Sequence, residues 1–129
     1  MVVVEDLDHD AVFGYPACPA VARYLTLYAA LVRARGGDPV IGPTLPALLR
    51  EAGLQDVQLS LVQPAFMAGP AKRIHLTTLE NVRDAMLAAD LVTEEELATV
   101  TAEMEAHVAD PDTIVAFPRM YQVFGRRPA

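Results

Sequence analysis

Four residues near the start of the chain are of types that move protons or bind polar ligands. Glu5, Asp6 and Asp8 follow a run of valines, and His9 comes directly after them. In open α/β sheets the carboxyl ends of strands face the ligand crevice, so this is a favoured place for chemistry. Two interpretations stay open: these side chains line a pocket, or they form a solvated acidic turn. We favour the first for Asp6 and Asp8.

The elements that would position these residues begin with a short strand. Val2 to Val4 form a continuous β-branched run, which is typical of a strand buried on both faces of a sheet. A loop is predicted from His9 to Pro19, where glycine and proline recur. A helix is predicted from Ala20 to Arg35, because apolar residues recur there at helical spacing and Gly36-Gly37 follows.

A second helix and strand are predicted near the middle of the chain. Thr44 is a plausible N-cap for a short helix from Leu45 to Ala52, and Gly53 stands where the helix would end. Residues 57–61 alternate between apolar and polar types, which predicts a half-exposed strand.

Two more helices and a long strand are predicted in the last part of the chain. Each helix has a capping-box pattern at its start, in which a threonine is followed three residues later by a glutamate. The pairs are Thr77 with Glu80 and Thr93 with Glu96. The strand is predicted from Thr113 to Gly125, with an interruption at a proline that indicates a bulge or an edge.

Length and composition predict a single folded domain over residues 1–129. Apolar residues make up 53% of the chain, which excludes a disordered acidic tail. The net charge of −7 repels nucleic-acid backbones and anionic membranes, so neither is expected as a partner. Cys18 is the only cysteine, which excludes an internal disulfide and indicates a reducing compartment. The start does not resemble a signal peptide, and we expect a cytoplasmic protein.

The order of the predicted elements indicates the fold class. It is strand, two helices, strand, two helices, strand, and such alternation predicts an α/β layer structure. We expect a small mixed sheet of about three strands with four or so helices, in which the last strand is an antiparallel insertion. No two histidines have the spacing of a helical metal site, so no metal is expected.

Three segments resemble class I S-adenosylmethionine-dependent methyltransferases. The strand that ends in Val-Val-Glu-Asp-Leu-Asp resembles the family's fifth strand. The stretch from Leu45 to Val57 is similar to the helix that enters its sixth strand, and the stretch from Tyr121 to Arg127 is similar to its seventh. The resemblance covers essentially all 129 residues. It implies a partial Rossmann-like fold in which the seventh strand runs antiparallel between the fifth and the sixth.

The resemblance also implies roles for the acidic residues and the histidine. Asp6 and Asp8 would orient the methyl acceptor or take its proton, and Glu5 would lie in the same pocket. His9 would act as a general base, because methyl transfer to oxygen or nitrogen often requires removal of a proton. For His9, a simple solvated loop position is the alternative.

Aromatic residues after the first strand have an implied role as well. In relatives the segment that follows the fifth strand folds over a small-molecule substrate, so Phe13 and Tyr15 would wall its pocket. Tyr24 and Tyr28 lie at helical spacing and are better explained as core residues. Cys18 is expected to be a small buried apolar residue.

One departure from the family concerns the cofactor, S-adenosylmethionine. The family's first half holds a glycine-rich turn that precedes a helix and an acidic residue after the second strand. These 129 residues contain neither, and Gly36-Gly37 follows a helix instead. We therefore expect the C-terminal, substrate-side portion of an enzyme, which binds no cofactor by itself and is inactive alone.

Two other interpretations stay open. In one, the chain is a stand-alone assembly or binding module, and the first strand or the helix from Ala20 to Arg35 packs against its counterpart in a homodimer. In the other, the cofactor-binding half belongs to a second polypeptide, which covers the same surface.

Overall fold

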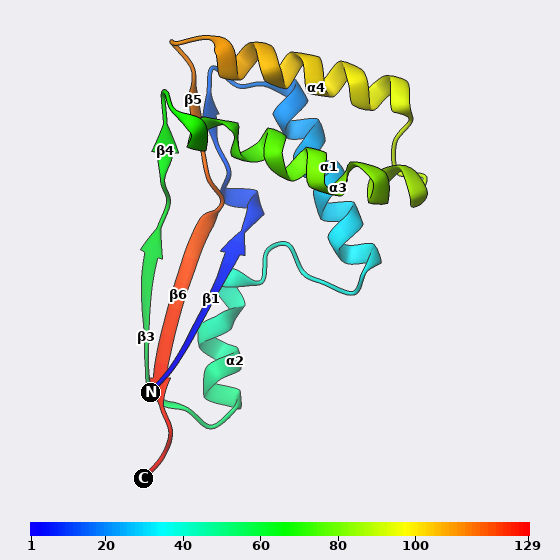
Figure 1. Ribbon diagram of the computed structural model, residues 1–129. Helices are drawn as coiled ribbons and strands as arrows, with labels where there is room; N and C mark the ends of the chain where they lie inside the picture. Colours follow the sequence, from blue (N-terminus) through cyan, green and yellow to red (C-terminus); the bar gives the residue numbers. More distant parts are fainter. The chain divides into compact units, whose positions relative to one another are not determined.

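The computed structural model describes all residues, 1–129, and divides the chain into two compact units. Unit 1 contains residues 1–12, 39–64 and 118–129, and unit 2 contains residues 13–38 and 65–117. Each unit has its own three-stranded sheet (Figure 1). The expectation of a single domain stays a prediction, and the two units are described separately.

Unit 1 is built on a sheet with the strand order β1-β6-β3. β1 spans Val2–Asp8, β6 spans Arg119–Arg126 and β3 spans Gln55–Val62. β6 lies in the middle and pairs antiparallel with both neighbours, so β1 and β3 run in the same direction. The antiparallel direction predicted for the last strand is confirmed. The expected mixed sheet is wrong, because every hydrogen-bonded pair of strands is antiparallel.

One face of this sheet is covered by the short helix α2, Leu45–Glu51. Leu45 and Leu49 are one helical turn apart, so both point to the sheet, where they meet Val123 of β6. These residues are the buried core of unit 1. Half-buried apolar residues surround them: Val4, Ile41, Leu54, Val57 and Tyr121.

The two ends of α2 differ from each other in how well the sequence predicts them. A 3-10 turn, η2 (Gly42–Thr44), runs directly into the helix, and Thr44 has helical backbone angles. Thr44 is the residue directly before the helix, as predicted, but its hydroxyl donates to the Ile41 carbonyl at 2.6 Å and caps no backbone N–H of α2. The predicted end at Gly53 is confirmed, because this glycine has a φ of 88°, which disfavours other residues.

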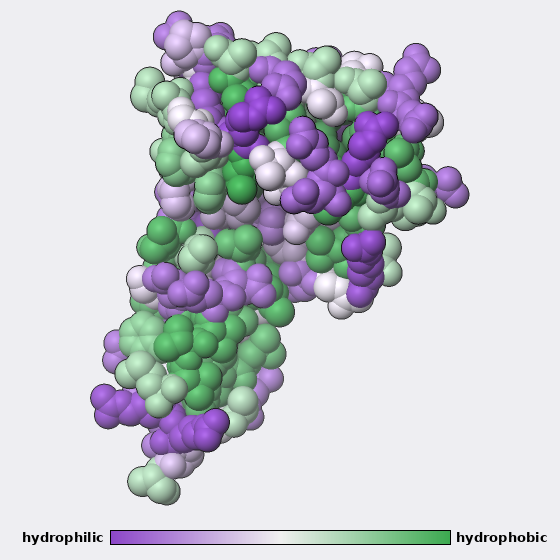
Figure 2. Space-filling view, viewed as in Figure 1, coloured by the Kyte–Doolittle hydropathy of each residue, from purple (hydrophilic) through white to green (hydrophobic).

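The opposite face of the sheet is covered by no helix of unit 1. Neighbouring residues of a strand point to opposite faces, so every second residue of each strand lies on this uncovered face. Three cross-strand rows result: Val3–Phe124–Gln58, Glu5–Gln122–Ser60 and Leu7–Met120–Val62. In Figure 2 the surface over the strands of unit 1 shows apolar patches on either side of a polar band.

Unit 2 combines a small sheet with three helices. The sheet has the order β2-β5-β4, with β2 at Gly14–Tyr15, β5 at Ile114–Ala116 and β4 at Ala65–Phe66. Both pairs of strands are antiparallel. The helices are α1 (Pro19–Ala34), α3 (Ile74–Ala88) and α4 (Glu94–Ala109), and a 3-10 turn, η3 (Pro70–Arg73), precedes α3.

The three helices of unit 2 enclose one continuous apolar core. Its buried residues come from all three helices and from the α3–α4 connection: Ala20, Tyr24, Leu27, Leu31, Leu76, Leu79, Met86, Val92, Leu97, Val100 and Met104. Cys18 is half-buried against this core, at the residue before α1. The helix predicted from Ala20 to Arg35 is confirmed as α1, with its start one residue earlier.

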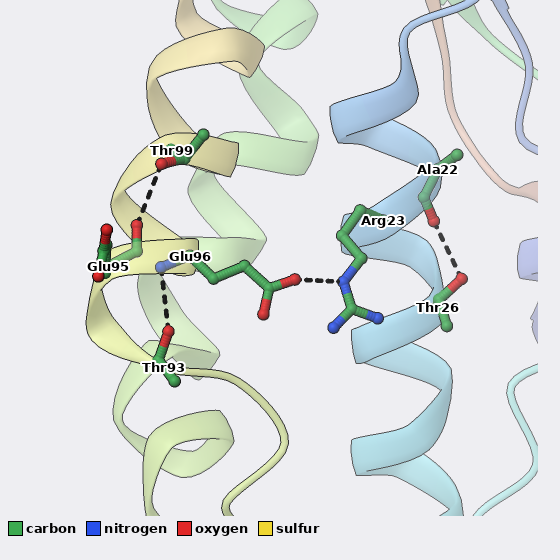
Figure 3. Close-up of polar contacts among 7 residues, drawn as sticks. All are labelled: Ala22, Arg23, Thr26, Thr93, Glu95, Glu96 and Thr99. Carbon is green, nitrogen blue, oxygen red and sulfur yellow. Dashed lines mark hydrogen bonds and ion pairs between the residues drawn. The ribbon is translucent and has the colours of Figure 1, made fainter.

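The two predicted capping boxes have different outcomes. The Thr93 hydroxyl accepts a hydrogen bond from the Glu96 backbone N–H at 3.1 Å, so α4 begins as predicted. The Glu96 carboxylate does not reach back to the cap; it accepts from Nε of Arg23 in α1 at 2.7 Å (Figure 3). Thr77 is not a cap, because α3 already begins at Ile74.

The carboxyl end of α4 is held by two buried polar side chains. Lys72 Nζ donates to the Asp110 carbonyl at 2.8 Å, and the Thr113 hydroxyl donates to the carbonyls of His107 and Asp110. The last carbonyls of a helix have no partner within the helix, so these donors supply the partners that α4 itself lacks.

The long strand predicted from Thr113 to Gly125 is two strands instead of one. β5 belongs to the sheet of unit 2 and β6 to the sheet of unit 1, and Phe117-Pro118 lies between them. Proline has no backbone N–H to donate, so the ladder ends there. The molecule is of the α/β class with four helices, as expected. None of these helices has the length and apolar character needed to cross a membrane.

Candidate functional site

The predicted catalytic residues lie at the carboxyl end of β1, in unit 1. The strand ends at Asp8, whose carboxylate accepts from the backbone N–H of Asp10 at 3.0 Å. This bond caps a single 3-10 turn, η1 (His9–Ala11), at which the chain turns out of the sheet. The bond orients Asp8, which is half-buried; Asp6 is exposed, and its carboxylate accepts from the Leu7 backbone N–H at 2.8 Å.

His9 is held by the backbone of Pro39, which begins the second segment of unit 1. Its backbone N–H donates to the Pro39 carbonyl at 3.0 Å, and its ring Nδ1 lies 3.0 Å from the same oxygen. A carbonyl oxygen only accepts, so Nδ1 carries the hydrogen. In the neutral imidazole the lone pair then belongs to Nε2, which is the atom that can accept a proton. The alternative interpretation, a simple solvated loop position, does not describe His9, because this residue is half-buried and hydrogen-bonded to Pro39.

Asp6 and Asp8 share the face of the sheet on which α2 lies. The register sets Asp6 opposite Tyr121 and Asp8 opposite Arg119. Tyr121 is packed against Gly42, where an added Cβ would come within 2.6 Å of its ring. The close approach of Gly42 therefore orients the tyrosine ring beside Asp6.

Arg119 does not form an ion pair with Asp8 in spite of this register. Its Nε donates instead to Gln63 Oε1, at the long distance of 3.4 Å. Gln63 Nε2 donates to the Ala11 carbonyl at 2.7 Å, so this glutamine connects the start of β6 to the turn after β1. The carboxyl ends of β1 and β3 and the start of β6 thus form one polar corner, which we call the β1 corner: Asp6, Asp8, His9, Gln63, Arg119 and Tyr121.

Glu5 does not belong to the β1 corner. It lies on the opposite face of the sheet, because neighbouring residues of a strand point in opposite directions. There its carboxylate accepts from Gln122 Nε2 at 3.3 Å. The structure brings Asp6, Asp8 and His9 together at one end of β1 and places Glu5 away from them. A direct role for Glu5 in the same pocket is not supported by this geometry.

Phe13 and Tyr15 belong to unit 2, on and beside the edge strand β2. Both rings are exposed, at 52% for Phe13 and 66% for Tyr15. Residues two apart on a strand share a face, so the two rings lie on one side of the small sheet. Their predicted role as walls of a substrate pocket stays a prediction.

The other two histidines lie in unit 2. His75 is buried, and its Nε2 lies 2.9 Å from the Ala116 carbonyl, to which it donates. Its ring stands 5.6 Å from the ring of Tyr24, and burial raises the pKa of that tyrosine. His107 is in the last turn of α4. The hydrogen bond of His75 thus links α3 to β5, and its ring packs against the core of unit 2.

A groove of about 220 Å³ lies between α3 and α4 of unit 2. Its lining is apolar at the base and charged at the rim: Leu76, Leu79, Leu97, Thr101, Glu80 and Arg83. No residue predicted from the sequence as part of a site lines it. No group of three or more His, Cys, Asp or Glu side chains is placed to hold a metal ion.

Two members of the β1 corner, Tyr121 and Gln63, were not predicted from the sequence. Tyr121 lies opposite Asp6, so knowledge of which face carries Asp6 would have pointed to it. For Arg119 the sequence leaves two interpretations, a pair with an acid of the first strand or an exposed edge position, and in the structure Arg119 contacts Gln63. No sequence pattern identifies the residues that contact the corner from other segments. Only the fold brings Pro39 to His9, Gly42 to Tyr121 and Gln63 to Arg119. Comparison with known proteins adds no relative: no protein-family model matches the chain, and no curated protein matches it significantly.

Proposed function

We propose that this chain is the substrate-side portion of a class I methyltransferase that acts on a small molecule. The observation that carries the proposal is the strand order β1-β6-β3, with α2 directly before β3 in the chain and β6 antiparallel between β1 and β3. This is the order that the resemblance implies for the fifth, seventh and sixth strands. The Rossmann-like character of the complete sheet is part of the proposal.

The connections of unit 1 support a substrate-binding role. β1 and β3 run in the same direction, and the chain leaves unit 1 after each of their carboxyl ends to form unit 2. In open α/β sheets, ligands bind at the carboxyl ends of the strands. The β1 corner lies at this end, and it supplies carboxylates and an imidazole.

Within the β1 corner, the chain's own residues have distinct roles in the proposal. Asp8 is oriented by its bond to the Asp10 N–H, and together with Asp6 it positions a polar acceptor. His9 accepts the acceptor's proton at Nε2, because the Pro39 carbonyl holds the hydrogen on Nδ1. Positioning is the main contribution of such a site.

The residues present do not fit a site for S-adenosylmethionine. The backbone N–H groups of Gly36 and Gly37 donate to the carbonyls of Arg33 and Val32, so they close the end of α1. Gly42 is packed against Tyr121. The cofactor therefore has to be bound by another half of the enzyme, and the chain alone is inactive in this proposal.

The experiment is a comparison of the chain alone with the chain co-expressed with a cofactor-binding half from the same genome. Calorimetric titration of the chain alone with S-adenosylhomocysteine should give no binding. The complex should transfer labelled methyl groups to small molecules, and Asp8→Asn or His9→Gln should abolish the transfer. Asp84→Asn, on the exposed surface of α3, is the matched control and should leave it unchanged.

Two results would contradict the proposal. Micromolar binding of S-adenosylhomocysteine to the chain alone would mean that the division between the halves is wrong. Methyl transfer that persists in the double variant His9→Gln and Asp8→Asn would show that the β1 corner takes no part in the reaction.

A second candidate function is a dimeric assembly or binding module without catalysis. It is favoured by the apolar surface of unit 1, where six large apolar side chains are exposed: Met1, Val3, Leu48, Leu59, Leu61 and Val62. Leu59 and Leu61 are neighbours on one face of β3, and exposed apolar patches mark interaction sites. Methylation by the complex would exclude it as the sole function.

A further inference from the structure

The sheet of unit 1 has two outer strands, and neither is paired on its outer side with another strand of the chain. β1 is one of them and β3 is the other. An outer strand presents backbone donors and acceptors to any strand that can lie beside it, and proteins commonly block such pairing with charged residues or proline. The two edges differ in this respect.

β1 carries the blocking residues and β3 does not. Glu5, Asp6 and Asp8 place three carboxylates on β1, so a second copy of β1 would bring like charges together. From Val57 to Val62, β3 contains no charged residue and no proline. The only charge of β3 is Asp56, which lies in a bulge at its start with a φ of 52°.

β3 also exposes apolar side chains on both faces. Leu59 and Leu61, on the face toward α2, are 46% and 50% exposed, and Val62, on the opposite face, is 40% exposed. On the face toward α2, the side chains of Val57, Leu59 and Leu61 are all apolar, whereas a solvated sheet face is normally polar. The exposed apolar residues of β3 therefore indicate a strand that is covered in its working state.

The residues of β3 are complementary to themselves. In an antiparallel pair of β3 strands centred on Leu59, Val57 lies opposite Leu61 of the other copy and Gln58 lies opposite Ser60. Apolar side chains then meet apolar ones on one face, and polar side chains meet polar ones on the other. A chain with a net charge of −7 repels its copies, and β3 is the neutral strand edge at which this repulsion is smallest.

We propose that a second copy of the chain binds at β3, so that two β3 strands pair antiparallel about a two-fold axis at Leu59. The two sheets of unit 1 then form one six-stranded sheet with β3 strands at its centre. A two-fold contact of this kind is closed and does not propagate into a filament. The inference does not rest on the proposed function, because it leaves the outer edge of β1 available for a cofactor-binding half.

Sedimentation equilibrium with two matched variants tests the inference. The wild-type chain should show a concentration-dependent mass that approaches about twice 13.9 kDa. Leu59→Lys brings two ammonium groups face to face at the axis, and should weaken dimerisation at least about tenfold. Val3→Lys makes the same change at an exposed residue of β1, 57% exposed, and should leave the dimer intact. Circular dichroism verifies that both variants are folded.

A disulfide experiment gives an independent readout. In a Cys18→Ser background, which removes the only natural thiol, Leu59→Cys should form a disulfide-linked dimer on mild oxidation, and Val3→Cys should not. A chain that stays monomeric at all concentrations would overturn the inference. Loss of the dimer in Val3→Lys with retention in Leu59→Lys would overturn it as well. Neither result bears on S-adenosylhomocysteine binding, so failure here is distinct from failure of the proposed function.

Discussion

The two units of this protein use apolar residues in opposite ways. Unit 2 encloses a large apolar core among three helices, in which Met86 and Leu97 have no exposed surface, although Phe13, Tyr15 and Met67 are exposed. Unit 1 buries only Leu45, Leu49 and Val123, and leaves apolar residues of β1 and β3 in solvent. Burial of apolar surface is the main source of stability, so unit 2 is the self-sufficient part and unit 1 the part whose surface suits partners.

The largest difference in stability is expected between a core substitution in unit 2 and a matched substitution in unit 1. Leu97→Ala removes a fully buried side chain of unit 2 and should lower the free energy of unfolding by about 2–5 kcal/mol. Leu61→Ala, on β3, should cost less than about 1 kcal/mol in the monomer, because half of that side chain is exposed. Urea unfolding followed by circular dichroism measures both. Equal losses would mean that unit 1 is as well packed as unit 2.

A glycine of unit 1 tests the packing at the β1 corner. Gly42→Ala puts a Cβ within 2.6 Å of the Tyr121 ring and should destabilise the protein by about 1–3 kcal/mol, because the ring has to move. Pro43→Ala, at the exposed neighbouring position, is the control for a local change in the chain. Tyrosine fluorescence with thermal unfolding reports both effects, and an unchanged melting temperature in Gly42→Ala would show that the contact is loose.

The two threonines at predicted helix starts offer a matched pair in unit 2. Thr93→Ala removes a side-chain cap of α4 and should cost about 1 kcal/mol. Thr77→Ala changes an exposed residue inside α3, where alanine is the better helix former, so it should be neutral or slightly stabilising. Thermal unfolding of the two variants side by side decides between them. A comparable loss of stability in Thr77→Ala would indicate that Thr77 caps α3, as the sequence predicts.

The smallest expected effect concerns acid stability of unit 2. The hydrogen bond from Arg23 lowers the pKa of Glu96, and the one from Arg73 lowers the pKa of Glu105, below the usual 4.5. A carboxylate with a lowered pKa stabilises the folded state above its unfolded pKa, and this contribution is lost as the pH falls through the folded pKa. Stability should therefore decline below about pH 4.5.

The double variant Glu96→Gln and Glu105→Gln should show a shallower decline over this range, since it has no such carboxylates to protonate. Both ion pairs are well exposed, so the difference should be small. Glu103→Gln, an exposed residue of α4 without an ion pair, is the control. Denaturant unfolding at a series of pH values measures how the free energy of unfolding changes with pH. Identical pH dependences in all three proteins would show that these ion pairs do not contribute to acid stability.

Elements with strong local signals could be predicted from the sequence. α1 has apolar residues at helical spacing and a Gly-Gly stop, and α4 has a threonine cap, so both were found within one residue of their observed starts. α3 was placed four residues late, because Ile74 starts it without any capping side chain and the Thr77 pattern is accidental. A capping pattern in the sequence therefore does not by itself determine where a helix begins.

For the candidate site, the sequence by itself determined which residue types stand at the end of the first strand and directly after it, namely two aspartates and a histidine. It could not determine the face to which each side chain points, and Glu5 lies on the opposite face of the sheet from Asp6 and Asp8. The partners of His9 and Arg119, which are Pro39 and Gln63, are 30 and 56 residues away in the chain. Only the tertiary structure decided these contacts, because strand register and chain crossings depend on interactions between distant segments that no local pattern contains.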